Sequence, residues 1–420
     1  MTTTLCNWRK GATPHQDIRE NRVSEALFAV NLSRAIARQG ADEYRDPALF
    51  FERTHLTRTL QSLIRDVLTT LRGEPGANSV IHLQTNFGGG KTHAELALYH
   101  LLTSPEQALA VPRVAGFLAE SGFDAVPQAA VAALPCADLY AGGRKVEGEQ
   151  GASPLHIHTL WGEIAYRLGA AGGRRSAVEL YQLVRDSDQQ QLAPGVTKLR
   201  QMLTQAGPNL ILVDELLHYV DKAAAVKVGD SNLATQTLGF LRELTEAVDA
   251  VDHSVLVASI TASSLEDLQV LTEEDAQLTL SKLEDILRRV EDSRTPIEGS
   301  EIYDVVRTRL FQAVDDEVVG QVAAAYARFY RSDPWKDLLP PESREAGYEE
   351  LLRQAYPFHP SVVKVLYERW GQPAAVPVDP GHVAFPGPSP GPPVESRPPG
   401  FSETLGVWPA DPPLGRGPGG

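Results

Sequence analysis

The chain has 420 residues, 42% of them hydrophobic and 22% charged, and a formal net charge of −15. This composition indicates a globular protein with room for two or three domains, and it excludes DNA or RNA binding by bulk charge. No membrane-spanning run, secretory signal or disulfide framework is present, since the cysteines are Cys6 and Cys136 alone, so we expect a cytoplasmic protein.

The first part of the chain is expected to be helical. Apolar residues at spacings of three and four predict a helix within residues 24–38 and a stronger one over residues 56–71. Thr54 is the expected N-cap of the second helix, and Gly73 is expected to end it. Residues 1–75 therefore form a predicted helical N-terminal segment.

A glycine cluster follows a short apolar strand, predicted over residues 79–84. Three glycines allow backbone N–H groups to surround phosphate oxygens, and the helix that opens at Lys91 adds its positive dipole end. Lys91 would reach the β- and γ-phosphates, and the Thr92 hydroxyl would bind Mg²⁺. The predicted phosphate-binding residues are Asn86, Phe87, Gly88, Gly89, Gly90, Lys91, Thr92 and His93. Thr85 stands where G-x-x-x-x-G-K-[ST] has its first glycine, so an ordinary glycine-rich turn is the alternative.

The middle of the chain alternates between strands and helices. We expect a strand over residues 130–134, a loop over 141–153, a helix over 155–168 and a helix over 196–205. His156 and His158 could suggest a metal pair, but two histidines without a third ligand are more often surface residues.

A second chemical motif follows at residues 209–215. Four apolar residues, Leu210 to Val213, predict a central parallel strand covered on both faces. Asp214 and Glu215 come at its carboxyl end, where open α/β sheets place their sites. Asp214 would complete a Mg²⁺ site, and Glu215 would orient and polarise an attacking water. Exposed acids at a strand end are the alternative.

A further strand is predicted over residues 254–261. We expect a loop at 222–231 and a helix at 233–248 before it, and a helix at 264–289 with caps at Ser263 and Ser281 after it. Ser259 or Thr261 would be a hydroxyl that senses the γ-phosphate. Predicted elements beyond this point are an edge strand at 294–297 and helices at 301–312, 316–329, 346–356 and 360–370.

The composition changes at Gly371. The last 50 residues hold 14 of the 30 prolines and 10 of the 34 glycines, with no lysine. We expect this segment to be disordered. Its abrupt loss of periodicity favours a wrong-frame translation of a truncated chain, and a genuine disordered extension is the alternative.

The chain resembles a family of predicted AAA+-type ATPases that carry domain of unknown function 499. The resemblance covers about residues 15–370, and its most specific piece is Gln84-Thr85-Asn86-Phe87-Gly88-Gly89-Gly90-Lys91-Thr92-His93. Other pieces are Phe50-Phe51-Glu52-Arg53-Thr54-His55-Leu56-Thr57, Thr159-Leu160-Trp161-Gly162-Glu163, Val213-Asp214-Glu215-Leu216 and Tyr356-Pro357-Phe358-His359-Pro360-Ser361. The family's own loop lacks the first glycine, which accounts for Thr85.

The resemblance implies an α/β fold of the P-loop NTPase (AAA+-like) kind: a three-layer parallel sheet over residues 76–300 and a partial helical lid over 301–370. It also implies a homo-oligomer and a role in prokaryotic anti-phage islands, beside DNA methyltransferase-like and helicase proteins. Candidates for an arginine that acts in trans are Arg288, Arg289 and Arg294.

The sequence thus predicts an ATPase that uses Mg²⁺-ATP to drive or gate a conformational change. Glu215 favours hydrolysis, whereas a family pattern that stops at Trp370 favours a nucleotide-gated binding switch with slow turnover. A non-catalytic scaffold fragment is a third hypothesis. The sequence leaves direct DNA binding open.

Overall fold

The computed structural model describes residues 8–21, 30–84, 90–147, 154–260, 268–288, 291–294, 301–332, 341–345 and 347–370. They divide into two compact units, Glu25–Glu298 and a second unit formed by Met1–Ser24 with Gly299–Gly420. Each unit is described by itself. The tail predicted to be disordered, residues 371–420, lies outside the described residues.

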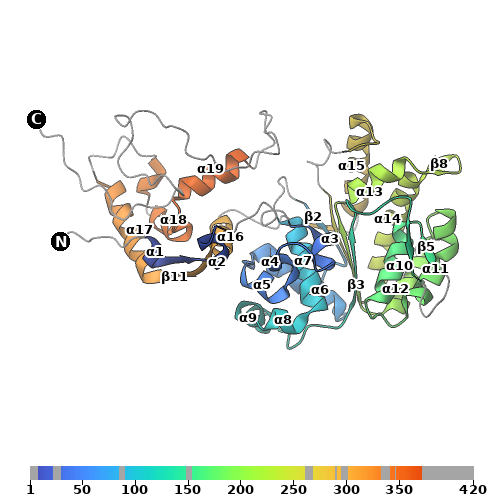
Figure 1. Cartoon of the computed structure of the whole chain (residues 1–420), viewed down its shortest axis with the longest axis horizontal. Helices are drawn as coiled ribbons and strands as arrows, with labels where there is room; N and C mark the ends of the chain where they lie inside the picture. The colour runs from blue at the N-terminus through green and yellow to red at the C-terminus, as the bar shows by residue number, and fades with distance from the viewer. Residues whose placement is uncertain are drawn as a thin grey trace, which may run out of the picture. The chain divides into compact units, whose positions relative to one another are not determined.

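A parallel β-sheet forms the centre of the larger unit (Figure 1). Its strands are β2 (Val80–Leu83), β3 (Ala130–Pro135), β6 (Asn209–Asp214), β9 (Ser254–Ser259) and β10 (Glu291–Arg294), in the spatial order β10-β2-β9-β6-β3. The register is continuous along β3, β6 and β9, where Ile211 lies opposite both Ala132 and Leu256. The predicted α/β class and the central position of β6 are confirmed.

In β2, β3, β6 and β9, residues that point to opposite faces of the sheet pack in different apolar clusters, as strand geometry requires. Leu210 and Leu212 of β6 pack in one buried cluster, and Ile211 and Val213 pack in the other. The unbroken apolar run of β6 therefore reflects burial on both faces, because helices cover both sides of the sheet.

One face is covered by helices from the N-terminal part of this unit and from the segment after β2 (Figure 1). They are α3 (Leu32–Ile36), α4 (Asp42–Arg45), α5 (Pro47–Glu52), α6 (Arg58–Leu71), α7 (Lys91–Thr103), α8 (Pro105–Leu109) and α9 (Pro112–Glu120). Gly73 ends α6 as predicted, with φ +76°. The N-cap prediction at Thr54 is wrong: Thr57 accepts the Leu60 N–H, whereas the Thr54 hydroxyl donates to the Phe50 carbonyl.

The other face is covered by later helices (Figure 1). They are α10 (Leu160–Ala170), α11 (Ala177–Gln190), α12 (Val196–Ala206), α13 (Leu216–Ala224), α14 (Leu233–Asp249) and α15 (Glu273–Arg288). Two small hairpins, β4 (Arg144–Val146) with β5 (Leu155–Ile157) and β7 (Lys227–Val228) with β8 (Ser231–Asn232), complete the unit.

Several predicted boundaries on this face are wrong. Residues 155–157 form a strand and not helix, because they pair with β4, and α10 starts only after its N-cap Thr159. The predicted loops 141–153 and 222–231 contain β4, the end of α13 and the β7–β8 hairpin. In α15 the predicted cap Ser281 is an interior residue, since Thr272 accepts the Asp275 N–H and the helix begins at Glu273. The described edge strand is β10, earlier than predicted.

The second unit combines elements from the first and last parts of the described chain. Its elements are α1 (Trp8–Gly11), β1 (Ala12–Pro14), α2 (Gln16–Arg19), α16 (Glu301–Leu310), β11 (Phe311–Val314), α17 (Asp316–Tyr330), a 3₁₀ turn at Pro341–Arg344, α18 (Tyr348–Ala355) and α19 (Pro360–Trp370). β1 pairs antiparallel with β11, and the His15 N–H donates to Leu310 O at 3.1 Å. The helix predicted to reach residue 312 therefore ends at Leu310, where strand pairing begins.

Candidate functional site at the carboxyl edge of the sheet

The connections that leave the neighbouring strands β2 and β9 lead to opposite edges of the sheet. The chain leaving β2 goes to β3 at one edge, and the chain leaving β9 goes to β10 at the opposite edge. In open α/β sheets, ligands bind outside the carboxyl ends of the strands at such a switch point. The residues that follow β2, β6 and β9 are therefore the first place to look for a site.

Three segments that are distant in sequence meet there. The Thr92 hydroxyl, at the start of α7, donates to Oδ1 of Asp214 at 3.2 Å. The Ser259 hydroxyl, at the end of β9, donates to the same oxygen at 2.7 Å, and the Glu215 N–H donates to Ser259 Oγ at 3.0 Å. The structure thus brings together the predicted site residues Thr92, Asp214, Glu215 and Ser259.

The start of α7 provides backbone donors. Gly90 is its N-cap, with φ +104° and ψ −17°, a left-handed conformation that glycine adopts without steric cost. Glycine has no side chain to cap the first turn of the helix, and the positive end of the helix dipole favours an anion there. Asn86, Phe87, Gly88 and Gly89 lie outside the described residues.

Lys91 is buried among carboxyl groups, with only 6% of its surface exposed. Burial lowers the pKa of Lys91, and the nearby Asp214, Glu215 and Glu95 oppose that shift. Burial and the neighbouring Glu215 raise the pKa of Asp214 to about 6, against the hydrogen bonds from Ser259 and Thr92 and the charge of Lys91. One buried cation therefore faces an acidic group that has lost much of its hydration.

Glu215 has a strained backbone. It is the N-cap of α13 with φ +55° and ψ +48°, in the left-handed region that costs a non-glycine residue about 1–2 kcal/mol. Strain of this kind persists where the surrounding structure fixes it, and it occurs preferentially at functional sites. Here the hydrogen bond from Glu215 N–H to Ser259 contributes to that fixation.

Sequence reasoning missed Glu95, four residues after Lys91 on the same helix. Its side chain is fully buried, and among the described residues neither carboxyl oxygen makes a hydrogen bond of normal geometry, although the Ser259 hydroxyl lies close enough to oppose part of the rise in the pKa of Glu95. Burial, Asp214 and Glu215 raise the pKa of Glu95 well above its ordinary value. The available signal was a single acid within the apolar stretch from Ala94 to Leu102.

The other predicted site residues make different contacts or lie outside the described residues. The His93 ring contacts α5 and Thr54: its Nε2 is 2.9 Å from Thr54 Oγ1, and its centroid is 4.5 Å from that of Phe50. Thr261 and Arg289 lie outside the described residues, and Arg288 and Arg294 are described by their backbone alone, in α15 and β10.

His156 and His158 stack on each other, with ring centroids 4.0 Å apart. In the described part of the chain no group of three or more His, Cys, Asp or Glu side chains could hold a metal ion. No described helix has the length and apolar character needed to cross a membrane.

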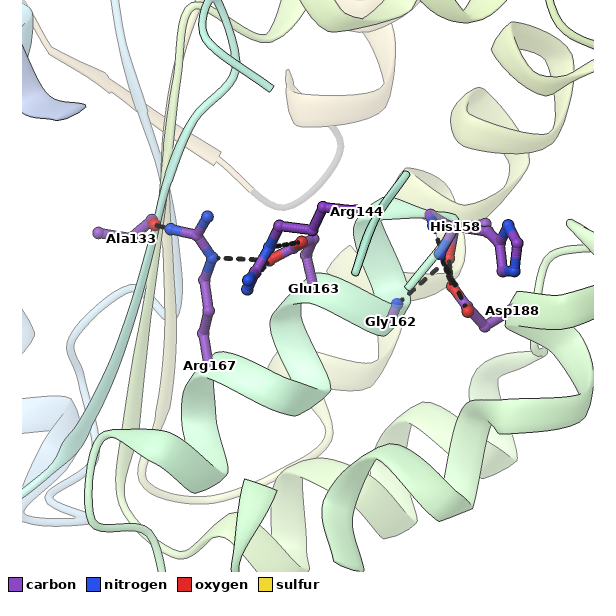
Figure 2. A network of polar contacts seen from close by, with 8 residues as sticks. Ala133, Arg144, His158, Gly162, Glu163, Arg167 and Asp188 are labelled. Atoms are coloured by element: carbon purple, nitrogen blue, oxygen red, sulfur yellow. Dashed lines mark hydrogen bonds and ion pairs between the residues drawn. The ribbon is translucent and has the colours of Figure 1, made fainter. Parts of the chain in front are cut away.

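A second polar network lies at the β3 edge (Figure 2). Glu163 accepts from Arg144 Nη2 at 3.0 Å and from Arg167 Nε at 2.9 Å, and Arg167 also donates to Ala133 O of β3. On α11, the buried carboxylate of Asp188 accepts the N–H groups of His158 and Thr159. The β4–β5 hairpin is thereby anchored to α10 and α11.

The fold and the site define a mixed α/β protein with a parallel sheet and a cluster of Lys, Thr, Asp, Glu and Ser at its carboxyl edge. The family model of the DUF499 N-terminal domain matches residues 10–126 and 138–295. This match covers more than half of the chain, and the chain belongs to that family. A search of curated proteins and a search of solved structures each find no match.

Proposed function

We propose that this protein binds ATP with Mg²⁺ at the carboxyl edge of the sheet and hydrolyses it. The observation that carries the proposal is the 3.2 Å contact between Thr92 Oγ1 and Asp214 Oδ1, which joins two motifs 122 residues apart in the chain. A hydroxyl and a carboxylate are donors that Mg²⁺ accepts, and it commonly takes one or two protein ligands together with substrate phosphates. The start of α7, whose N-cap is a glycine, and the buried Lys91 favour an anion at the same place.

Each residue has a distinct task in this proposal. Lys91 neutralises phosphate charge, and Thr92 with Asp214 would hold Mg²⁺, which when bound supplies charge neutralisation and polarises phosphate oxygens. Glu215 orients the attacking water and accepts its proton. Ser259 holds Asp214 and the Glu215 backbone together, so it fixes the relative position of the two acids.

The strand order supports the P-loop NTPase class. The strand bearing Ser259 lies between the strand that leads to Lys91 and the strand that ends at Asp214. We propose an AAA+-type ATPase that acts as an oligomer, with a trans-acting arginine among Arg288, Arg289 and Arg294. Its proposed setting is prokaryotic anti-phage defence, beside DNA methyltransferase-like and helicase proteins. Phosphate release measured with and without DNA tests whether DNA takes part.

The test of the core proposal uses Lys91→Ala and Glu215→Gln, with Lys227→Ala as a control at an exposed lysine. We expect Mg²⁺-ATP to raise the melting temperature of the wild type, the control and Glu215→Gln, but not of Lys91→Ala. Glu215→Gln should lower phosphate release sharply while binding is kept. If Lys91→Ala binds ATP as well as the wild type, the site assignment is wrong. Binding without release would favour the nucleotide-gated switch, and no binding by the wild type would favour the scaffold.

A further inference from the structure

The helix α13 follows Asp214 and Glu215, which we call the acid pair. It is hydrogen-bonded to the loop on each side of it. α13 begins directly after Glu215, and β6, which precedes it, lies between β9 and β3 in the sheet. Two consecutive residues near the end of α13, Asp221 and Lys222, reach in different directions to the segments that follow those two strands.

Asp221 binds the segment after β9. Its side chain is 3% exposed, and its carboxylate accepts the backbone N–H groups of Gln269, Val270 and Leu271 at 3.0, 3.0 and 2.8 Å. Three N–H donors on one buried carboxylate form a strong, directional attachment, because hydrogen bonds to an ionised acceptor are stronger than neutral ones. The entry into α15 is therefore held to α13.

Lys222 binds the loop after β3. Its ammonium group donates to the carbonyls of Ala137 and Leu139, the second at 3.2 Å. Leu139 also lines a small pocket together with Tyr219 of α13, and Arg144 and Glu163 of the anchored hairpin network in Figure 2 line the same pocket. Lys222 thus attaches α13 to the loop after β3, which lies next to the hairpin that Arg144 and Glu163 hold in place.

We propose that Asp221 and Lys222 are positioning residues for the acid pair, which hold α13 so that Glu215 keeps its left-handed conformation next to Ser259. The catalytic meaning of this inference rests on the proposed ATPase function. The N-terminal end of α13 has the Glu215–Ser259 hydrogen bond, and the other end has these two attachments. The apolar side chains of α13 pack in the core, so releasing the far end should let the short helix shift only slightly, enough to relax the backbone strain at Glu215.

Hydrogen exchange without nucleotide tests the link directly. We compare the whole wild-type chain with Asp221→Ala and Lys222→Met, and with the controls Asp230→Ala and Lys227→Met at exposed positions of the β7–β8 hairpin. We expect about 10-fold faster exchange or more at the amides of residues 215–219 in both variants and none in the controls. If faster exchange is confined to residues 137–139 or 268–272, the attachments are only local and the proposal is overturned. Asp221→Asn, which keeps one acceptor oxygen, replaces Asp221→Ala if the latter does not fold.

Turnover separates this inference from the proposed function. In a chain that hydrolyses ATP, both variants should lower kcat by about 10- to 100-fold and leave the Kd for Mg²⁺-ATP within about 2-fold, because only the geometry of the acid pair changes. An unchanged kcat beside faster exchange would overturn the positioning role. If the wild type binds no ATP, the proposed function and the catalytic role both fail, while the exchange measurement still decides whether the attachments hold Glu215.

Discussion

The Nε2 atom of His93 lies 2.9 Å from the Thr54 hydroxyl oxygen. Because that hydroxyl already donates to Phe50 O at 2.7 Å, it accepts from His93, which fixes the Nε2–H tautomer in this contact. His93 was predicted from the glycine motif as a phosphate-binding residue. Its ring joins the first turn of α7 to α5 and the segment that follows it.

We therefore predict that His93→Ala acts mainly on stability. The loss of one hydrogen bond and of the ring contact with Phe50 should lower the free energy of unfolding by about 1–2 kcal/mol. Combining it with Thr54→Val in a double-mutant cycle isolates the pair, because the lost Thr54–Phe50 bond cancels. Affinity for Mg²⁺-ATP should stay within about 2-fold. A large loss of affinity with unchanged stability would show that the His93 side chain serves the phosphate site and not mainly the packing of α7.

Glu95 should be destabilising for the nucleotide-free chain. It is fully buried, and in the described part of the chain its carboxyl oxygens have at most a weak contact with the Ser259 hydroxyl, which donates to Asp214. Glu95→Met keeps a similar volume and removes this poorly satisfied polar group, so we expect the free energy of unfolding in urea to rise by about 1–3 kcal/mol. Glu106→Met, on the exposed side of α8, is the matched control and should change little. Loss of stability in Glu95→Met would mean that the carboxyl group has a stabilising partner.

Asp214 should make the nucleotide-free protein less stable as the pH rises. Burial raises its folded-state pKa from 3.8 to about 6, so the folded chain favours the protonated form. Its contribution to stability is complete below pH 3.8 and is lost as the pH rises through about 6. Asp214→Asn cannot lose a proton and keeps an oxygen that accepts from Ser259 and Thr92.

The measurement is urea unfolding of wild type and Asp214→Asn between pH 4 and 8. Between pH 4 and pH 7, the difference in the free energy of unfolding between Asp214→Asn and wild type should shift in favour of the variant by about 2–3 kcal/mol, since each pKa unit corresponds to about 1.4 kcal/mol. A difference that does not change with pH would show that Asp214 titrates alike in the folded and unfolded chains.

The sequence predicted those features that depend on local pattern. The apolar run Leu210–Val213 marked β6, and the glycine cluster followed by Lys91 marked the strand-to-helix turn. The start of α10 has a local signal in its N-cap Thr159, which accepts the Gly162 N–H, but the strand before it depends on pairing with β4, and Thr159 is held by Asp188, 29 residues further along the chain. The contacts of Lys222 could not be predicted from a local pattern either, because its acceptors are 83 and 85 residues away in sequence.

The burial of Glu95 was also beyond a local pattern. In α7, residues on every side are buried, because the helix lies between the sheet and the N-terminal helices. A helix buried all round has no polar face on which an acid could be recognised as exposed or enclosed. Only the tertiary arrangement shows that this carboxyl lies beside the Asp214–Ser259 pair.

Gly143 should tolerate a side chain far less well than Gly76, although both glycines have a positive φ angle. It has φ +79°, and a Cβ atom there would lie 2.2 Å from the Ile157 carbonyl oxygen, so the close approach of β4 to β5 depends on glycine. Gly76 has φ +97° with no heavy atom within 4 Å of its Cβ position, which makes it the matched control. Gly76→Ala carries the left-handed backbone cost alone, about 1 kcal/mol, whereas Gly143→Ala adds a backbone clash and should cost about 2–4 kcal/mol in all. Urea unfolding of both variants checks the difference. Equal losses would show that the hairpin can shift away from Gly143, and so that its anchoring by Glu163 and Asp188 does not hold it rigidly.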